Sequence, residues 1–258
     1  MDVFQRFAEL VQRPESEIDL ARGALLIAAA PEPGLDPDPS LAMLDEFALG
    51  VADLVSLCRR LFVDLGFKGD SRTYHSPVNS FLHRVLERRQ GIPITLSVVT
   101  LEVARRAGLH LEPIGMPGHF LVRDPGTGFY IDSFGAAVLD EEGCEALFRD
   151  VSGSGPEVAF GPEMRPVVGA REILARMLLN LAHTYRVNAE PSNLEWVMRM
   201  RLLIPGVAPD EAIELARAVA AQGRVLEAAA ELEERAQLAP DLAKEFLPAA
   251  RAMRAQLN

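Results

Sequence analysis

A change of hydrophobic periodicity after Gly108 restricts what this 258-residue chain can fold into. Up to that glycine, apolar residues recur at the three- and four-residue spacing of helices, and the same spacing returns from about Arg171 to the end. Between these helical parts lie three short apolar runs that are typical of strands. They are residues 111–114, 119–123 and 129–134. The sequence therefore predicts an α+β fold that is mainly helical and carries a small antiparallel sheet.

The last two runs are separated by a dense turn signal, Asp-Pro-Gly-Thr-Gly, which begins at Asp124 and predicts a β-hairpin. If the loop consists of the four residues from Asp124, then Arg123 pairs with Gly128 and His119 pairs with Asp132. Directly opposed residues point to the same face of a sheet, with Cβ atoms about 5 Å apart. An imidazole beside a carboxylate is the base-and-orienter half of a catalytic triad. The same contact also suits a purely structural pair, and a one-residue shift of register abolishes it.

Composition excludes several classes of function. The chain has 26 Lys and Arg against 37 Asp and Glu, a net charge of -11, whereas a nucleic-acid-binding protein needs a basic face. No stretch approaches the roughly 20 apolar residues that cross a bilayer, and the start does not resemble a secretory signal. The two cysteines, Cys58 and Cys144, are too few for a disulfide framework and fit a reducing cytoplasm. We expect a cytoplasmic protein of bacterial type that binds neither nucleic acid nor membrane.

No metal or cofactor site is predicted. The histidines show no metal-ligand spacing with one another or with the cysteines. The segment Gly115-Met116-Pro117-Gly118 precedes a predicted strand and lacks the lysine of a phosphate-binding loop.

The C-terminal helices form a predicted second domain. Residues 152–166 are rich in Gly, Ser and Pro and are typical of a linker, which divides the chain into residues 1–165 and 166–258. In the second part, apolar positions recur at an offset of 34 residues, which is the period of a tetratricopeptide repeat. The residue types expected at fixed points of that repeat occur at Gly223, Ala228, Leu232 and Pro240. A plain helical bundle with coincidental spacing is the alternative.

Four short motifs occur in order along the first part of the chain. They are Asn79-Ser80, Gly91-Ile92-Pro93-Ile94, the segment from Pro117 to Arg123, and Ile131-Asp132. With the run 91–134 that contains most of them, they resemble the transglutaminase-like superfamily. They are most similar to its bacterial SirB branch, in which such a domain precedes tetratricopeptide-like helices. The resemblance covers about residues 15–240 and implies the same two-part organisation here.

The resemblance also implies which residues occupy the catalytic positions. Active members of the superfamily place a cysteine at the start of a helix that ends in Arg-x-Leu-Gly, followed by a histidine and then an aspartate on adjacent strands. His119 and Asp132 match the last two positions, while counting back fifteen residues from Gly108 places Pro93 at the nucleophile. A helix N-terminus activates a thiol, but proline has no nucleophilic atom. His119 and Asp132 are therefore expected to be a remnant dyad.

Other side chains are considered as substitutes for the missing cysteine. Thr95 and Ser97 lie in the first turns of the same predicted helix, where a hydroxyl more often caps the helix or bonds back to a carbonyl. Cys58 has the surroundings of a packed helix face, and Cys144 follows the hairpin in a predicted helix. The resemblance further implies that four signature residues line the cleft, although helix capping explains the first two nearly as well. They are Asn79, Ser80, Gly91 and Phe120.

Two functions follow from these features. The first is a non-catalytic protein-interaction or regulatory module, a pseudoenzyme with a protein or peptide partner, favoured by Pro93 and by the repeat helices. The second is a divergent hydrolase or acyl transferase that uses Thr95, Ser97 or water with His119 as base and Asp132 as orienter. The oligomeric state is left open.

Overall fold

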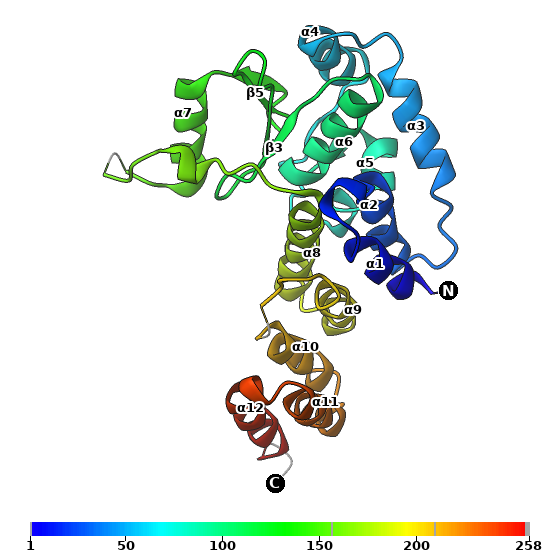
Figure 1. The fold of residues 1–258 in the computed structure, drawn as a ribbon, viewed down its shortest axis with the longest axis vertical. Helices are drawn as coiled ribbons and strands as arrows, with labels where there is room; N and C mark the ends of the chain where they lie inside the picture. The colour runs from blue at the N-terminus through cyan, green and yellow to red at the C-terminus, as the bar shows by residue number, and fades with distance from the viewer. Residues whose placement is uncertain (1, 156, 209, 256–258) are drawn as a thin grey trace. The chain divides into compact units, whose positions relative to one another are not determined.

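The computed structural model describes residues 2–155, 157–208 and 210–255 (Figure 1). Its α-helices are α1 Val3–Val11, α2 Leu20–Ala29, α3 Asp38–Ala48, α4 Leu54–Cys58, α5 Leu82–Arg88, α6 Pro93–Arg106, α7 Glu141–Ser152, α8 Ala170–Val187, α9 Pro191–Arg201, α10 Glu211–Ala220, α11 Val225–Leu238 and α12 Ala243–Ala255. Its strands are β1 Lys68–Gly69, β2 Gln90–Gly91, β3 Glu112–Ile114, β4 Leu121–Arg123, β5 Tyr130–Asp132 and β6 Ala137–Leu139. Short 3-10 and π segments are η1 Glu15–Glu17, η2 Arg59–Asp64, η3 Pro77–Asn79, η4 Pro162–Met164 and η5 Pro240–Leu242. The predicted mainly helical α+β fold is confirmed.

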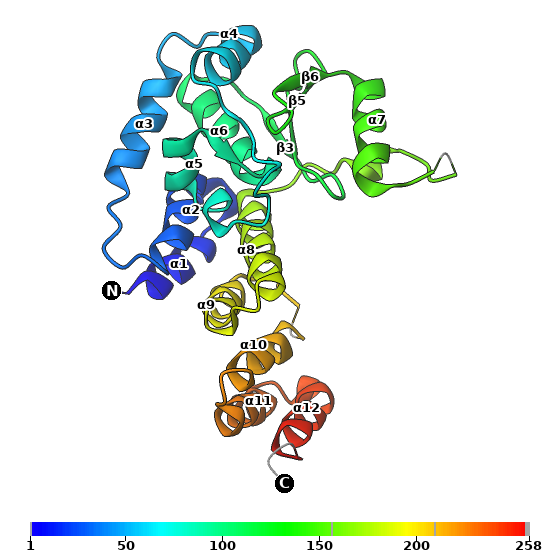
Figure 2. The same cartoon turned by 180° about the vertical axis from the view of Figure 1, so that it is seen from behind.

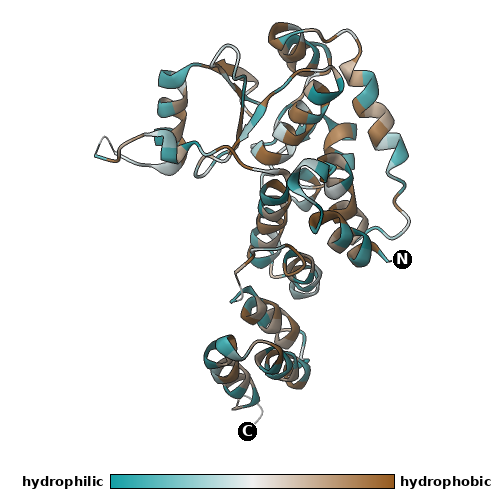
Figure 3. Ribbon diagram, viewed as in Figure 1, coloured by the Kyte–Doolittle hydropathy of each residue, from teal (hydrophilic) through white to brown (hydrophobic). Residues whose placement is uncertain are grey.

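The chain forms two compact units. One is Glu15–Met177, and the other consists of the described residues of Met1–Pro14 and Leu178–Asn258. The division between the units falls inside α8, whereas the sequence places a linker at residues 152–166; the domains 1–165 and 166–258 remain a prediction. In the second unit, α9, α10, α11 and α12 pack in succession, and Figure 3 shows brown and teal residues alternating along them, as in amphipathic helices. No helix in the described ranges is both long and apolar enough to cross a membrane.

Helix α6 is the centre of the first unit. It packs against α2, α3 and α5, which Figures 1 and 2 show from opposite sides, and also against strand β4. The helix starts at Pro93, whose fixed backbone angle and missing N–H suit a first helical position, and ends before Gly108, which has a φ of +79°. Apolar residues occur all round it, and most of its side chains are buried. It is therefore a core helix that fixes the surrounding elements.

The sheet has four antiparallel strands in the order β3-β4-β5-β6. Its three predicted strands are present, and β6 was not expected from the sequence. One face carries Leu121 and Tyr130, which pack with Cys144 and Phe148 of α7. The other face carries Val122, Ile131 and Val138, which stand opposite one another in the register. The sheet is thus packed on both faces, but unevenly: Val122 and Ile131 are fully buried, while Val138 on the edge strand is 46% exposed.

Ser76 and Pro77 suit the start of a helix that would run to Gln90, but the structure corrects this expectation. A 3-10 turn at Pro77–Asn79 comes first, and α5 begins only at Leu82. The main-chain carbonyl of Asn79 accepts hydrogen bonds from Thr95 Oγ1 at 2.6 Å and from the N–H of Ile92 at 3.4 Å. Because this carbonyl is committed to α6, it does not continue a helical ladder. Gly50 has a φ of +79° and lies in the break between α3 and α4.

Helix α5 carries a buried histidine that should make stability depend on pH. Nε2 of His83 lies 3.3 Å from Oε2 of Glu32, but the geometry is not that of a hydrogen bond, and within the described residues both ring nitrogens are buried without one. Burial lowers the pKa of His83, and the attraction of Glu32 offsets this only in part. The unfolded chain binds a proton near pH 6.5, whereas the folded ring stays neutral to lower pH.

We therefore expect the wild-type free energy of unfolding to fall as the pH drops below about 6.5, with a slope of up to about 1.4 kcal/mol per pH unit until the lowered native pKa is passed. His83→Leu should remove this part of the slope, because leucine has no titrating group. Urea unfolding between pH 5 and pH 8 measures it, with the exposed His110→Gln as the control. Equal slopes for wild type and His83→Leu would contradict the prediction.

Candidate functional site

His119 and Asp132 lie side by side at one end of the hairpin. Nε2 of His119 is 2.8 Å from Oδ1 of Asp132, and both side chains are more than nine-tenths buried. Asp132 is the last residue of β5, and His119 lies two residues before β4. The structure thus contains the contact between imidazole and carboxylate that the sequence predicts, while the catalytic role of the pair stays a prediction.

The predicted register of the hairpin is wrong by two residues. The structure pairs Arg123 with Tyr130 and not with Gly128. Because side chains alternate between the faces of a sheet with a period of two, a shift of two residues keeps every side chain on its predicted face. His119 and Asp132 are then diagonal neighbours instead of direct partners, and the imidazole ring is long enough to reach the carboxylate.

The turn itself explains the shift. The main-chain N–H of Asp124 donates to the carbonyl of Phe129 at 2.9 Å, so Asp124 belongs to the ladder and not to the loop. Its carboxylate accepts hydrogen bonds from the N–H of Gly126 and from Oγ1 of Thr127, at 3.0 and 2.7 Å. Gly128 has a φ of +79°, a left-handed conformation that fits the end of a turn. Asp124 therefore holds the turn from its first residue, and the loop starts one residue later than expected.

Several groups keep the Asp132 carboxylate ionised. Burial raises the pKa of Asp132. The opposing effects are larger, so the net shift is downward: they are the hydrogen bond and positive charge of His119 and the N–H groups of Phe134 and Gly135. The bond from the N–H of Phe134 to Oδ1 is 3.0 Å long. The ring of Phe134 also stands edge-on to the His119 ring, with centroids 6.1 Å apart. The pair is fixed in position and in orientation.

Arg176, in the first half of α8, was not predicted to matter and holds the backbone at His119. Its Nη2 donates to the carbonyls of Met116 and His119, at 3.1 and 3.3 Å. Its guanidinium lies over the ring of Phe120, 5.2 Å from the centroid. The carbonyls that it binds are those of the turn that leads into β4. A long-range contact thus sets the backbone from which His119 projects.

The arrangement defines what the pair can do chemically. With Nε2 directed at the carboxylate, the neutral ring carries its proton on Nε2 and presents a lone pair at Nδ1. Such a ring can accept a proton from a thiol, a hydroxyl or a water molecule. A neutral ring held in this way has the chemistry of a base, and a catalytic role for the pair, which would need a group to deprotonate, stays a prediction.

Pro93 supplies no such group. It is the first residue of α6 and is buried. A cysteine at this point would be activated by the helix N-terminus, whereas the proline ring consists of hydrocarbon apart from its backbone nitrogen. Proline provides the helix start without the nucleophile.

The two hydroxyls in the next turns of α6 are directed to backbone groups. Thr95 is fully buried, and its Oγ1 is 2.6 Å from the carbonyl of Asn79 and 3.2 Å from the N–H of Ile92. Ser97 is also fully buried and donates to the carbonyl of Phe120 at 3.4 Å. Across the residues that the structure describes, neither hydroxyl makes a hydrogen bond to the His119 ring.

The two thiols are poor candidates as well. Burial raises the pKa of Cys58 to about 11 and that of Cys144 to about 12, so both stay protonated at neutral pH. Cys144 packs with Leu121 and Phe148 in the core between α7 and the sheet. A protonated thiol in an apolar core is a packing residue and not an activated nucleophile.

The signature residues Asn79, Ser80 and Gly91 are buried in a polar junction beside α6. Nδ2 of Asn79 donates to the carbonyl of Thr73 at 2.8 Å, and its Oδ1 accepts from Nη1 of Arg88 at 2.8 Å. A Cβ on Gly91 would lie 2.9 Å from Oγ1 of Thr95, which is too close. These contacts give the signature residues a packing role, and a binding role for them and for the buried Phe120 stays a prediction.

Sequence reasoning missed Asp70, which completes this junction. Its carboxylate accepts hydrogen bonds from the N–H and Oγ1 of Thr73, at 2.9 and 2.5 Å, and from Nη2 of Arg88 at 3.1 Å. These bonds hold the pKa of Asp70 well below its usual range. The Asp-x-x-Thr spacing is a signal for the local turn. Nothing local indicates Arg88, which is eighteen residues further on.

No cluster of three or more His, Cys, Asp or Glu side chains suited to a metal ion occurs in residues 2–155, 157–208 and 210–255. Pockets of about 440 and 720 Å³ lie among the described residues of the first unit. Neither is lined by His119 or Asp132.

The family follows from the sequence comparison. A model of the transglutaminase-like superfamily matches residues 32–179, more than half of the chain and a segment that includes both His119 and Asp132. The chain belongs to the transglutaminase-like superfamily.

Relatives with this domain occur in bacteria and in mammals. A UPF0162 protein of Xylella fastidiosa is 34% identical over 186 residues, which is 66% of each chain. UPF0162 protein PA3419 of Pseudomonas aeruginosa is 31% identical over 70% of this chain and 69% of its own. Human F-box only protein 21 is 35% identical over 55% of this chain but only 24% of its own length. The match thus covers about two thirds of the bacterial relatives, and no solved structure matches.

Proposed function

We propose that this transglutaminase-like chain is non-catalytic and acts as a protein-interaction or regulatory module. One observation carries the proposal: α6 starts with Pro93 where the superfamily resemblance places the nucleophile, and no hydroxyl or thiol among the described residues makes a hydrogen bond to the His119 ring. Without a nucleophile at that point, transfer through a thioester has no starting group.

The His119–Asp132 pair has a structural role in such a protein. A buried hydrogen bond between an imidazole and an ionised carboxylate fixes the segment before β4 against the end of β5. Removing one member leaves a buried group unsatisfied, which is costly. Retention of both residues therefore does not require a reaction.

The proposal includes the SirB-type organisation with a tetratricopeptide-like second part. Supporting it, Gly223 has a φ of +82° between α10 and α11, and Ala228 and Leu232 of α11 are fully buried. Pro240 opens the short turn before α12. Stacked helical pairs of this kind usually bind peptides or proteins. The cytoplasmic location indicated by the two cysteines belongs to the same proposal.

The sequence relationship to F-box only protein 21 supports a modular role. The shared segment is 161 residues long and makes up 24% of that human protein, so the domain occurs within chains of very different length. A domain that is combined with different surroundings suits recognition as well as catalysis.

The proposal is tested with His119→Gln, which can keep a hydrogen bond to Asp132 but cannot serve as the base. We expect capture of partners by in-cell cross-linking to stay within about twofold of wild type, since the buried side chain offers a partner little surface. We also expect no turnover of a p-nitrophenyl ester or of a glutamine donor with an amine acceptor. Thermal melting of both proteins checks that they are folded.

A divergent hydrolase or acyl transferase is the second candidate, favoured by the intact pair with Nδ1 of His119 not bonded to Asp132. Thr95, Ser97 or a water molecule would then serve as nucleophile. The candidate requires measurable turnover that His119→Gln abolishes and that Thr95→Val or Ser97→Ala reduces if the hydroxyl attacks. Turnover with these properties would reject the non-catalytic proposal.

A further inference from the structure

The first unit has an apolar pocket of about 720 Å³ beside its sheet. Neither His119 nor Asp132 lines this pocket. Its apolar lining comes from α4, from the segment between α6 and β3, and from the β5–β6 side of the sheet. The apolar residues that matter here are Leu54, Val55, Leu109, Leu111, Phe129 and Val138. Three of them are well exposed: Val55 at 76%, Phe129 at 44% and Val138 at 46%. Large apolar side chains that gather around a hollow and remain exposed are typical of a binding surface.

One wall of the pocket is an edge strand. β6 is the last strand in the order β3-β4-β5-β6, so its outer edge has no strand neighbour within the described sheet. An extended peptide can hydrogen-bond to such an edge. A peptide residue paired with Val138 would place its side chain on the same face as Val138, which is the face that lines the pocket. The geometry thus favours an extended segment with one large apolar side chain.

The charges around the pocket are acidic. The charged lining residues are Asp53 and Asp124, and no Lys or Arg is among those that line it. Hydrogen bonds from Ser56 lower the pKa of Asp53, which keeps that carboxylate ionised at neutral pH. The whole chain carries a net charge of -11. A peptide with Lys or Arg beside its apolar residue complements this rim, whereas an acidic peptide does not.

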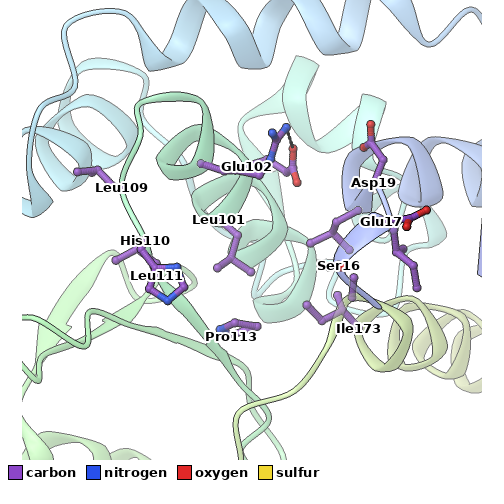
Figure 4. Close-up of a pocket in the computed structure, with 14 residues that line it drawn as sticks. Ser16, Glu17, Asp19, Leu101, Glu102, Leu109, His110, Leu111, Pro113 and Ile173 are labelled. Carbon is purple, nitrogen blue, oxygen red and sulfur yellow. Dashed lines mark hydrogen bonds and ion pairs between the residues drawn. The ribbon is translucent and has the colours of Figure 1, made fainter. Parts of the chain in front are cut away.

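A second pocket, of about 440 Å³, adjoins the first and also contains carboxylates. Leu109, His110 and Leu111 line both pockets. Its lining contains the carboxylates of Glu17, Asp19 and Glu102, which Figure 4 labels, and the guanidinium of Arg105. Asp19 is paired with Arg22, and Glu102 with Arg105 and Arg106, so Glu17 adds most to the negative charge. A basic residue a few positions along a bound peptide would find a favourable potential there.

We propose that the corner formed by α4 and the β6 edge is the docking site for an extended peptide segment of a partner protein, with one large apolar anchor flanked by Lys or Arg. The proposal rests on the interaction role proposed above and names the partner's chemistry. The anchor fills the apolar pocket, the peptide backbone pairs with β6, and the basic residues face Asp53, Asp124 and, in the second pocket, Glu17. Affinity comes from the buried anchor, and the charges supply specificity.

The test uses the full-length chain and a phage-displayed library of random dodecapeptides, followed by fluorescence anisotropy with the most enriched peptide. Two double variants of equal polarity are compared. Val55→Asn with Phe129→Asn changes the pocket, while Leu49→Asn with Val63→Asn changes side chains that are 72% and 74% exposed and do not line it. All four sites are exposed, so both variants should keep the fold.

We expect enriched peptides with one large apolar residue next to Lys or Arg, and an affinity that falls with salt. The pocket variant should bind about tenfold more weakly or worse, and the control variant should bind within about twofold of wild type.

Several results would overturn the proposal. They are no enrichment, enrichment of acidic or purely apolar peptides, or equal binding by the two variants. If the wild-type chain dimerises, and the pocket variant abolishes the dimer while the control variant does not, the pocket binds a second copy of the chain instead. If one of these results appears while wild type and His119→Gln still capture a partner in the cross-linking experiment, only the docking site is rejected. Absence of any captured partner would reject the interaction role itself.

Discussion

Asp70→Ala should lower the free energy of unfolding by about 3 kcal/mol, because it leaves Arg88 and Thr73 without their shared partner. The carboxylate is 7% exposed and joins the segment after β1 to α5. Arg88 is 32% exposed and can regain some hydration, so the expected loss is at the lower end of that for a buried ion pair. Asn79 loses support too, since the same Arg88 holds its side chain.

Urea unfolding followed by circular dichroism measures this effect. Asp64→Ala is the matched control: Asp64 lies 3.9 Å from Arg59, both side chains are exposed, and the expected change is below about 0.5 kcal/mol. Asp70→Asn should fall between the two, because the amide can accept some of the bonds but carries no charge. If Asp70→Ala and Asp64→Ala unfold alike, the polar junction does not stabilise the fold.

Phe120→Ala should destabilise the chain by about 4 kcal/mol, the loss usual for an aromatic ring removed from a tight core. Phe120 is 1% exposed, and the guanidinium of Arg176 lies over its ring. The resemblance to the superfamily implies that this residue lines a binding cleft, whereas its burial indicates packing. Phe120→Leu should cost about 1.5 kcal/mol, because most of the apolar volume is kept.

The matched control is on the same hairpin. Phe129 is 44% exposed, so Phe129→Ala should cost less than about 1 kcal/mol. Differential scanning calorimetry of the three variants distinguishes a packing role of Phe120 from a binding role. If Phe120 is a packing residue, the melting temperature should fall most for Phe120→Ala, less for Phe120→Leu and least for Phe129→Ala. A Phe120→Ala protein that melts like wild type but loses partner capture would show that Phe120 is a binding residue.

Local sequence patterns were enough to predict the elements whose structure depends on residues close together in the chain. Pro93 after Gly91 predicts the start of α6, and Gly108 predicts its end. The turn signal at Asp124 predicts the hairpin, although its loop begins one residue later than expected, because the choice between adjacent turn registers depends on side-chain bonds within the turn. The contact between His119 and Asp132 survived this error, since a shift of two residues preserves the face of each side chain.

The sequence could not predict the features that rest on long-range contacts. The parallel pairing of β1 with β2 involves only two residues on each strand, too short a segment to have a pattern. Arg88 reaches Asp70 over eighteen positions, and Arg176 reaches the carbonyl of His119 over 57. Side-chain and backbone partners at such separations are chosen by how the elements pack, which no local periodicity records.

By itself, the sequence determined the mainly helical α+β class, the superfamily, and the placement of a proline where a nucleophile is expected, because these depend on residue types and spacings along the chain. Only the tertiary structure decided that Thr95 and Ser97 direct their hydroxyls to backbone carbonyls, and that Asn79 belongs to a buried junction. Only it brought α4, the 109–111 segment and the β6 edge around one apolar pocket. The physical reason is that burial and hydrogen-bond partners are properties of the packed chain, and they exist only once distant segments have met.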